Sequence, residues 1–128
     1  DGVREIPAED FFVGPDTHIT QMTALDANEV LTAVRISSKW AGKRFYFEKV
    51  ADRDVWDFAL VSVAVAMSMD GDTISDSRFV CGGVACVPHR LTQVENAARG
   101  KSLSEESANA VAALASQGTK PLNYNHFK

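Results

Sequence analysis

The chain has 128 residues, of which 45% are hydrophobic and 23% charged, so it can bury a core and has the composition of a globular domain. Its net charge of -4 argues against phosphate-backbone binding as the main task, because that binding depends on clustered lysine and arginine. No apolar run approaches the roughly 18 residues of a membrane-spanning helix. The three histidines and two cysteines complete no zinc or iron–sulfur ligand set.

The two cysteines, Cys81 and Cys86, are separated by four residues and have no second pair. We predict two half-buried thiols in a reducing compartment, and favour this interpretation over a disulfide or a metal site. The protein is expected in the cytoplasm, with the periplasm as the alternative.

The residue patterns at both ends of the chain indicate a fragment of a longer protein. The opening DGVREIPAEDFF is polar and acidic and lacks the pattern of a signal peptide. The closing KPLNYNHFK places a turn where a helix would be about to start. We therefore expect a chain cut at both ends.

The first third of the sequence lacks a core of its own. The stretch REIPAEDFFVGPDT combines prolines and a glycine with an aromatic pair, which predicts an irregular segment with one short helical or strand-like element. The stretch EVLTAVRIS, residues 29–37, predicts a strand. One face of that strand is mostly apolar and comprises Val30, Thr32, Val34 and Ile36.

From Gly42 onward the sequence predicts a self-sufficient α+β unit. Residues 43–51, 57–69 and 73–86 have strand patterns, and Asp70–Asp72 is a hairpin turn, so we predict an antiparallel meander. After Pro88 the apolar spacing becomes helical, which predicts helices over 90–100 and 104–118, the second with Ser104 as its N-cap. The expected fold is an antiparallel three- or four-stranded sheet packed on a helical bundle.

Catalytic and phosphate-binding motifs are weak. Serines in the strands have no histidine nearby in sequence, and the aspartate pairs lie where turns need aspartate. Gly82 and Gly83 match neither the dinucleotide-binding nor the P-loop spacing, so we predict a bulge or a close backbone approach there.

The stretch FYFEKVADRD, residues 45–54, places a lysine on an aromatic strand face. In an extended chain Phe45, Phe47 and Lys49 point to the same side. The lysine either extends to solvent along its stem, which is the commoner case, or meets an anionic or carbonyl-rich ligand lying against the sheet. Arg53 and Asp57, four residues apart, predict either a structural ion pair or a turn clamp.

An ordered series of motifs resembles a known family. It comprises DGVREIPAEDFFVGP, NEVLTAVRI, YFEKVADRDVWDFALVSVAVAM, SRFVCGGVACVPHRLTQVENAARGKSL and KPLNYNHFK. Together these stretches resemble the C-terminal half of the FAD-binding (medium) subunit of the molybdenum hydroxylases, the family of xanthine dehydrogenase, carbon monoxide dehydrogenase and aldehyde oxidoreductase. Ser37 and Cys86 stand where the family commonly has proline, which affects loop geometry more than function.

The resemblance implies a division of the chain and a flavin site. Residues 1–38 would be the C-terminal tail of the FAD-binding domain, and residues 39–128 the flavoprotein C-terminal α+β domain with its last helix truncated. Most FAD contacts would come from upstream residues that are absent here. Two positions match family contacts with the flavin cofactor, Leu31 and Lys49, while Phe45 and Phe47 would anchor their strand on the core.

The resemblance also implies a role and partners. The chain would be part of an electron-transfer subunit that passes electrons from iron–sulfur clusters through FAD to an acceptor such as NAD. Its partners would be a molybdopterin-binding large subunit and a [2Fe-2S] small subunit, with no catalytic residue and no metal site in this chain, and the fragment alone would be inactive. The alternative is a subunit-interaction module that does not contact flavin.

Overall fold

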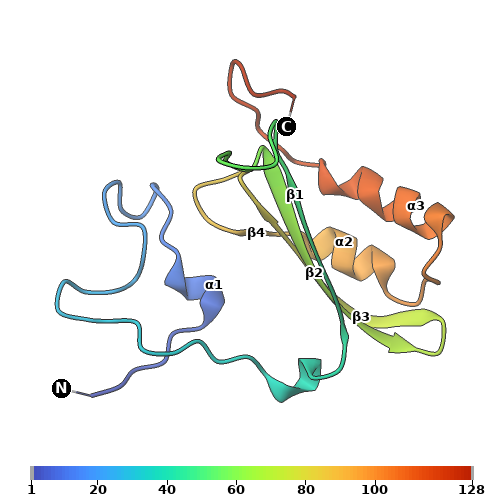
Figure 1. The fold of residues 1–128 in the computed structure, drawn as a ribbon, viewed down its shortest axis with the longest axis horizontal. Helices are drawn as coiled ribbons and strands as arrows, with labels where there is room; N and C mark the ends of the chain where they lie inside the picture. The colour runs from blue at the N-terminus through green and yellow to red at the C-terminus, as the bar shows by residue number, and fades with distance from the viewer. Residues whose placement is uncertain (1, 128) are drawn as a thin grey trace.

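The computed structural model describes residues 2–127, in which a four-stranded antiparallel sheet separates two helices from an irregular N-terminal segment (Figure 1). The strands occur in chain order and comprise β1 (Arg44–Val50), β2 (Val61–Asp70), β3 (Thr73–Gly82) and β4 (His89–Arg90). The helices α2 (Thr92–Ala98) and α3 (Glu105–Ala115) lie on one side of the sheet. This arrangement confirms the predicted α+β class and the antiparallel meander.

The two faces of the sheet differ because side chains alternate along each strand. The register aligns Phe47 with Ala64 and Ala64 with Val80, so these three residues share one face. The opposite face presents Val65, which is buried, and Ser77, which is 2% exposed. Helix α2 packs on this second face and α3 packs against α2. The core on this face is completed by Ile74, Leu91, Val94 and Ala98.

Helix α3 begins directly after Ser104, as predicted, whereas α2 begins at Thr92 and not at Arg90, which belongs to β4; both helices are shorter than predicted. The Ser104 hydroxyl accepts a hydrogen bond from the Ser107 N–H at 3.2 Å, which satisfies one of the unpaired donors at the start of α3. The Gln93 side chain of α2 donates to the Leu114 carbonyl of α3 at 2.6 Å. The N-terminal segment contributes α1 (Ala8–Phe11) and the 3-10 turn η1 (Ser38–Trp40), so its predicted short helical element is present.

Glycine residues explain the predicted hairpin turn and the predicted close approach of the backbone. Gly71 has φ +56° at the first position of the two-residue β2–β3 loop, where a hairpin turn favours glycine. A Cβ on Gly82 would lie 2.7 Å from Ser62 Oγ, and one on Gly83 would lie 3.2 Å from the Leu60 carbonyl oxygen. The predicted close backbone approach is therefore confirmed, whereas the register shift of the sheet lies at Ser68 and Met69.

The predicted strand over residues 29–37 is wrong for this structure. Residues 29–36 carry no strand, and Val30, Val34 and Ile36 are all exposed. A strand requires a neighbour that accepts and donates its backbone hydrogen bonds. Within residues 2–127 the N-terminal segment has only the isolated bridge between Phe12 and Thr23. The division of the chain near residue 38 stays a prediction.

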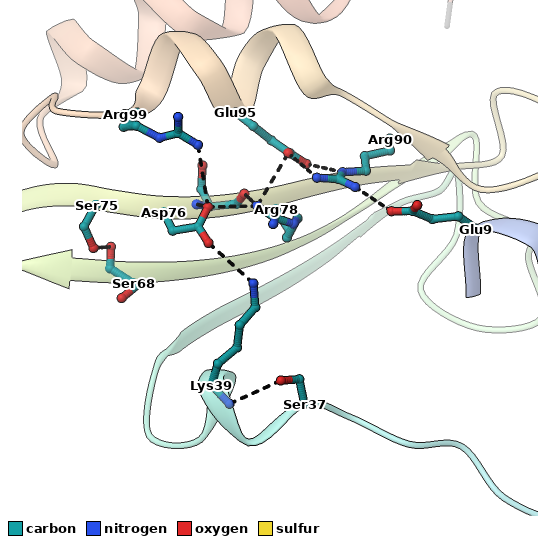
Figure 2. Close-up of polar contacts among 11 residues, drawn as sticks. Glu9, Ser37, Lys39, Ser68, Ser75, Asp76, Arg78, Arg90, Glu95 and Arg99 are labelled. Atoms are coloured by element: carbon teal, nitrogen blue, oxygen red, sulfur yellow. Dashed lines mark hydrogen bonds and ion pairs between the residues drawn. The ribbon is translucent and has the colours of Figure 1, made fainter. Parts of the chain in front are cut away.

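A network of charged side chains joins the sheet edge to α2 (Figure 2). The Glu95 carboxylate is 5% exposed and accepts from Arg90 Nε at 2.9 Å, Arg90 Nη2 at 2.8 Å and the Phe79 N–H at 3.1 Å. Burial by itself raises the pKa of Glu95, but these hydrogen bonds and the charges of Arg90 and Arg78 lower it on balance. The carboxylate is therefore ionised and fastens the helix to β3 and β4.

A second carboxylate extends this network along β3. Asp76 accepts from Arg78 at 2.8 Å and forms longer ion pairs with Lys39 at 3.7 Å and Arg99 at 3.9 Å. The Trp40 ring lies beneath two of these cations, with Lys39 Nζ 4.9 Å and Arg78 Cζ 5.5 Å from its centroid. The turn η1 is thereby attached to β3 (Figure 2).

The Glu95 network makes a stability prediction. We expect Glu95→Gln to lower the free energy of unfolding by about 2–4 kcal/mol, because it leaves partly buried arginine charge without its carboxylate. Urea titration followed by circular dichroism measures the change. Glu106→Gln is the control on the exposed first turn of α3 and should cost less than about 1 kcal/mol. Equal losses for the two variants would contradict this role of Glu95.

Removal of the buried Ser77 hydroxyl, unlike removal of the Glu95 charge, is not expected to lower stability. Its hydroxyl is buried between sheet and helices and has no hydrogen-bond partner among the described residues. Ser77→Ala should therefore change the free energy of unfolding by less than about 0.5 kcal/mol or raise it, since it removes an unsatisfied polar group. Val94→Ala, in the same core, should cost about 2 kcal/mol. A cost for Ser77→Ala as large as that for Val94→Ala would show that the hydroxyl has a partner.

Candidate functional site

Lys49 is anchored at the end of β1. It pairs with Ser62 of β2 in the sheet register, and its Nζ donates a hydrogen bond of 2.6 Å to the Asp57 carbonyl oxygen. The side chain is exposed. An ammonium group has three donors, so a second acceptor can bind while this bond is kept.

The loop between β1 and β2, residues 51–60, is shaped by local hydrogen bonds. Asp57 Oδ2 accepts from the Asp52 N–H at 2.9 Å and from the Arg53 N–H at 3.0 Å. The Arg53 guanidinium donates to the Trp56 carbonyl at 2.7 Å. The turn clamp predicted for Arg53 and Asp57 is therefore confirmed, and the alternative of an ion pair between the two side chains is wrong.

The tip of this loop is strained and apolar. Trp56 has φ +56°, which is rare for a bulky residue because its Cβ crowds the backbone. Its side chain is 93% exposed and that of Phe58 is 94% exposed. The loop thus holds two aromatic side chains in solvent beside Lys49, and such held strain is typical of sites under functional constraint.

A shallow apolar groove of about 420 Å³ lies on the open face of the sheet, the face away from α2 and α3. Its walls include Phe45, Phe47, Ala64 and Val80. Phe45 and Phe47 are 63% and 65% exposed, so the prediction that they anchor β1 on the core is wrong. The helices cover the other face, where the valines of β2 supply the core, and the aromatic face of β1 is left open.

Leu31 and Lys49 are placed on separate parts of the chain. Leu31 is about half exposed and belongs to the N-terminal segment before η1, whereas Lys49 is the penultimate residue of β1. Within residues 2–127, no hydrogen bond joins these two residues. Their predicted contacts with flavin therefore stay predictions.

The site offers one ammonium donor, Lys49, on the same strand as Phe45 and Phe47, which line the apolar groove. No group of three or more metal-binding side chains exists within the described part of the chain. Both cysteines are free thiols, and burial raises the pKa of Cys81, which makes it a poorer nucleophile. The ammonium can bind a ligand that offers hydrogen-bond acceptors.

Sequence reasoning missed two features of this region. It did not find the strain at Trp56 or the Glu95 network. The turn clamp at Asp57 was predictable, because an aspartate that follows charged turn residues is a signal for backbone capping. No local pattern predicts positive φ at tryptophan, because that conformation is imposed by the contacts around it.

The strain at Trp56 has a measurable consequence. Trp56→Gly and Trp56→Ala both delete the exposed indole, but glycine accepts φ +56° without a Cβ clash. The glycine variant should therefore have a free energy of unfolding about 1 kcal/mol higher than the alanine variant. Denaturant titration of both proteins measures the difference. At an unstrained exposed position an alanine variant is more stable than a glycine variant. A higher free energy of unfolding for Trp56→Ala than for Trp56→Gly would therefore contradict backbone strain at this position.

Residues 45–126 match the sequence model of a family described as the CO dehydrogenase flavoprotein C-terminal domain. The nicotine 6-hydroxylase medium subunit of Paenarthrobacter nicotinovorans is 37% identical over 96% of this chain and 40% of its own length. The carbon monoxide dehydrogenase medium chain of Hydrogenophaga pseudoflava is 32% identical over 87% of this chain and 37% of its own length.

The fold is similar to solved structures of the same kind. The crystal structure of quinoline 2-oxidoreductase from Pseudomonas putida 86 superposes with a TM-score of 0.73 at 31% identity, covering 94% of this chain and 39% of that one. The chain thus spans about 40% of the length of these relatives. The family match covers β1 to the residues beyond α3, and on this evidence the chain belongs to the CO dehydrogenase flavoprotein C-terminal domain family.

Proposed function

We propose that this chain is the C-terminal part of the FAD-binding subunit of a molybdenum hydroxylase. Relatives named as medium chains of carbon monoxide dehydrogenase and as a nicotine hydroxylase medium subunit support this assignment. One relative is named as the FAD-binding subunit of an aldehyde oxidoreductase. The subunit would work in the cytoplasm with a molybdopterin-binding large subunit and a [2Fe-2S] small subunit.

The free hydrogen-bond donors of Lys49 fit the acceptor atoms along one edge of a flavin. The Lys49 ammonium keeps two donors beyond its bond to Asp57, and the ring carbonyls and nitrogens of a flavin are acceptors for such donors. FAD, when bound, would take electrons that arrive from the iron–sulfur clusters and deliver them to an acceptor such as NAD. The role of this chain would be to hold and orient the cofactor, with Leu31 as a second, apolar contact.

The observation that supports this proposal best is the anchoring of Lys49. Its hydrogen bond to the Asp57 carbonyl fixes the ammonium instead of leaving it to move freely in solvent. A partly desolvated contact from a fixed cation to a polar ligand contributes about 1.5–3 kcal/mol. A loop ordered around one lysine is what a binding role requires.

We predict that Lys49→Ala weakens FAD retention in the full-length subunit by at least about tenfold. Visible absorbance after dialysis measures the bound flavin, and titration of the apoprotein gives the dissociation constant. Lys43→Ala is the control, because Lys43 is also an exposed lysine and lies just before β1. The 128-residue chain alone should bind little FAD.

The competing function is a subunit-interaction module without a flavin contact. The exposed aromatic residues Trp56 and Phe58 favour it, because aromatic side chains anchor many protein interfaces. Identical FAD occupancy, spectrum and reduction rate in wild type and Lys49→Ala would support this alternative and remove Lys49 from the flavin site.

A further inference from the structure

The two proposed flavin contacts belong to parts of the chain that must be held together. Leu31 lies in the N-terminal segment, and Lys49 lies on the sheet. If both touch one cofactor, the N-terminal segment must keep a fixed position relative to β1. A contact that sets this position would control the geometry of the flavin site.

Arg90 supplies such a contact. Two of its nitrogens, Nε and Nη2, donate to Glu95 of α2, and its third, Nη1, donates to Glu9 of α1 at 2.5 Å. Figure 2 shows the guanidinium between the two carboxylates, with Glu95 on the helix side and Glu9 on the N-terminal side. One side chain thus joins residues that are 81 positions apart.

The guanidinium is fixed before Glu9 binds to it. The two-pronged bond to Glu95 sets the plane of the guanidinium, because the fork geometry of arginine matches a carboxylate in one orientation. Glu95 is itself fixed, since it is 5% exposed and accepts the Phe79 N–H of β3. Glu9 therefore docks on a cation whose position is determined by the sheet and α2.

Further contacts connect α1, which carries Glu9, to the segment that contains Leu31. Arg4 donates from two nitrogens to the two oxygens of Glu29, each at 2.5 Å, and to the Ala24 carbonyl at 2.7 Å. The hydrogen bonds from Arg4 lower the pKa of Glu29 to about 2, so this pair stays charged at neutral pH. Glu29 precedes Leu31 by two residues. The Ala24 N–H donates to the Phe11 carbonyl of α1 at 2.8 Å, so a chain of contacts runs from Arg90 through α1, Ala24 and Arg4 to the segment that contains Leu31.

We propose that Glu9 and Arg90 are positioning residues, whose ion pair holds the segment bearing Leu31 at a set distance from the sheet bearing Lys49. This inference rests on the proposed function, because it assumes that both residues contact FAD. An ion pair on the molecular surface would thus affect the affinity for the cofactor. Exposed ion pairs contribute little to stability, so the effect should be seen in flavin binding while the fold is kept.

The test uses the full-length FAD-loaded subunit with Glu9→Ala. Its control is Glu106→Ala, because Glu106 is an exposed carboxylate on the first turn of α3, outside the N-terminal segment, and its loss changes the net charge equally. We expect Glu9→Ala to raise the dissociation constant for FAD about threefold and Glu106→Ala to leave it unchanged. Glu9→Asp, which keeps the charge on a shorter stem, should recover part of the affinity. Visible absorbance and flavin fluorescence titrations provide the constants.

The outcomes separate this inference from the proposed function. If Lys49→Ala weakens FAD binding while Glu9→Ala matches Glu106→Ala, the flavin site stands and the positioning role is overturned. If Glu9→Ala lowers the melting temperature but leaves the dissociation constant unchanged, the ion pair is only structural and the proposal is again overturned. If Glu9→Ala weakens binding and Lys49→Ala does not, Lys49 is no flavin contact, and the proposal that the ion pair sets the distance between two flavin contacts is overturned with it.

Discussion

The fold depends on the buried carboxylate of Glu95. A charge in the interior is costly unless each of its oxygens is paired, and here Arg90 and the Phe79 N–H supply the donors. This requirement places α2 at one position along β3, because only there do the guanidinium and the backbone N–H converge on one carboxylate. The small apolar core of Val94, Ala98 and their neighbours then fills the remaining space.

The sheet has one covered face and one open face, and the difference explains the distribution of exposed apolar residues. The helices bury the valines of β2, while Phe45 and Phe47 stand on the open side. The N-terminal segment lies on that same side and exposes apolar side chains of its own (Figure 1). Two apolar surfaces that both remain exposed are typical of parts that pack against further protein.

The loop after β1 shows how local hydrogen bonding prepares a binding group. Asp57 uses its carboxylate to cap two backbone N–H groups and its carbonyl to hold Lys49. Trp56 takes up the strained backbone angle that this closure imposes. The lysine of the strand FYFEKV is therefore neither extended freely into solvent nor buried, and its remaining donors are presented at the end of the sheet.

The sequence by itself determined the order and type of the three long strands and the two helices from Gly42 onward, because alternation, turn glycines and helix caps act over a few residues. It did not predict the short strand β4, which forms only by pairing with β3. The ordered motifs also identified the family. Tertiary structure alone decided which sheet face the helices cover, since both faces of β1 and β2 offer apolar residues. It also decided that residues 29–36 form no strand and that Arg90 joins Glu95 to Glu9. Such pairings between distant residues leave no local pattern, because they depend on where the whole chain brings each charge.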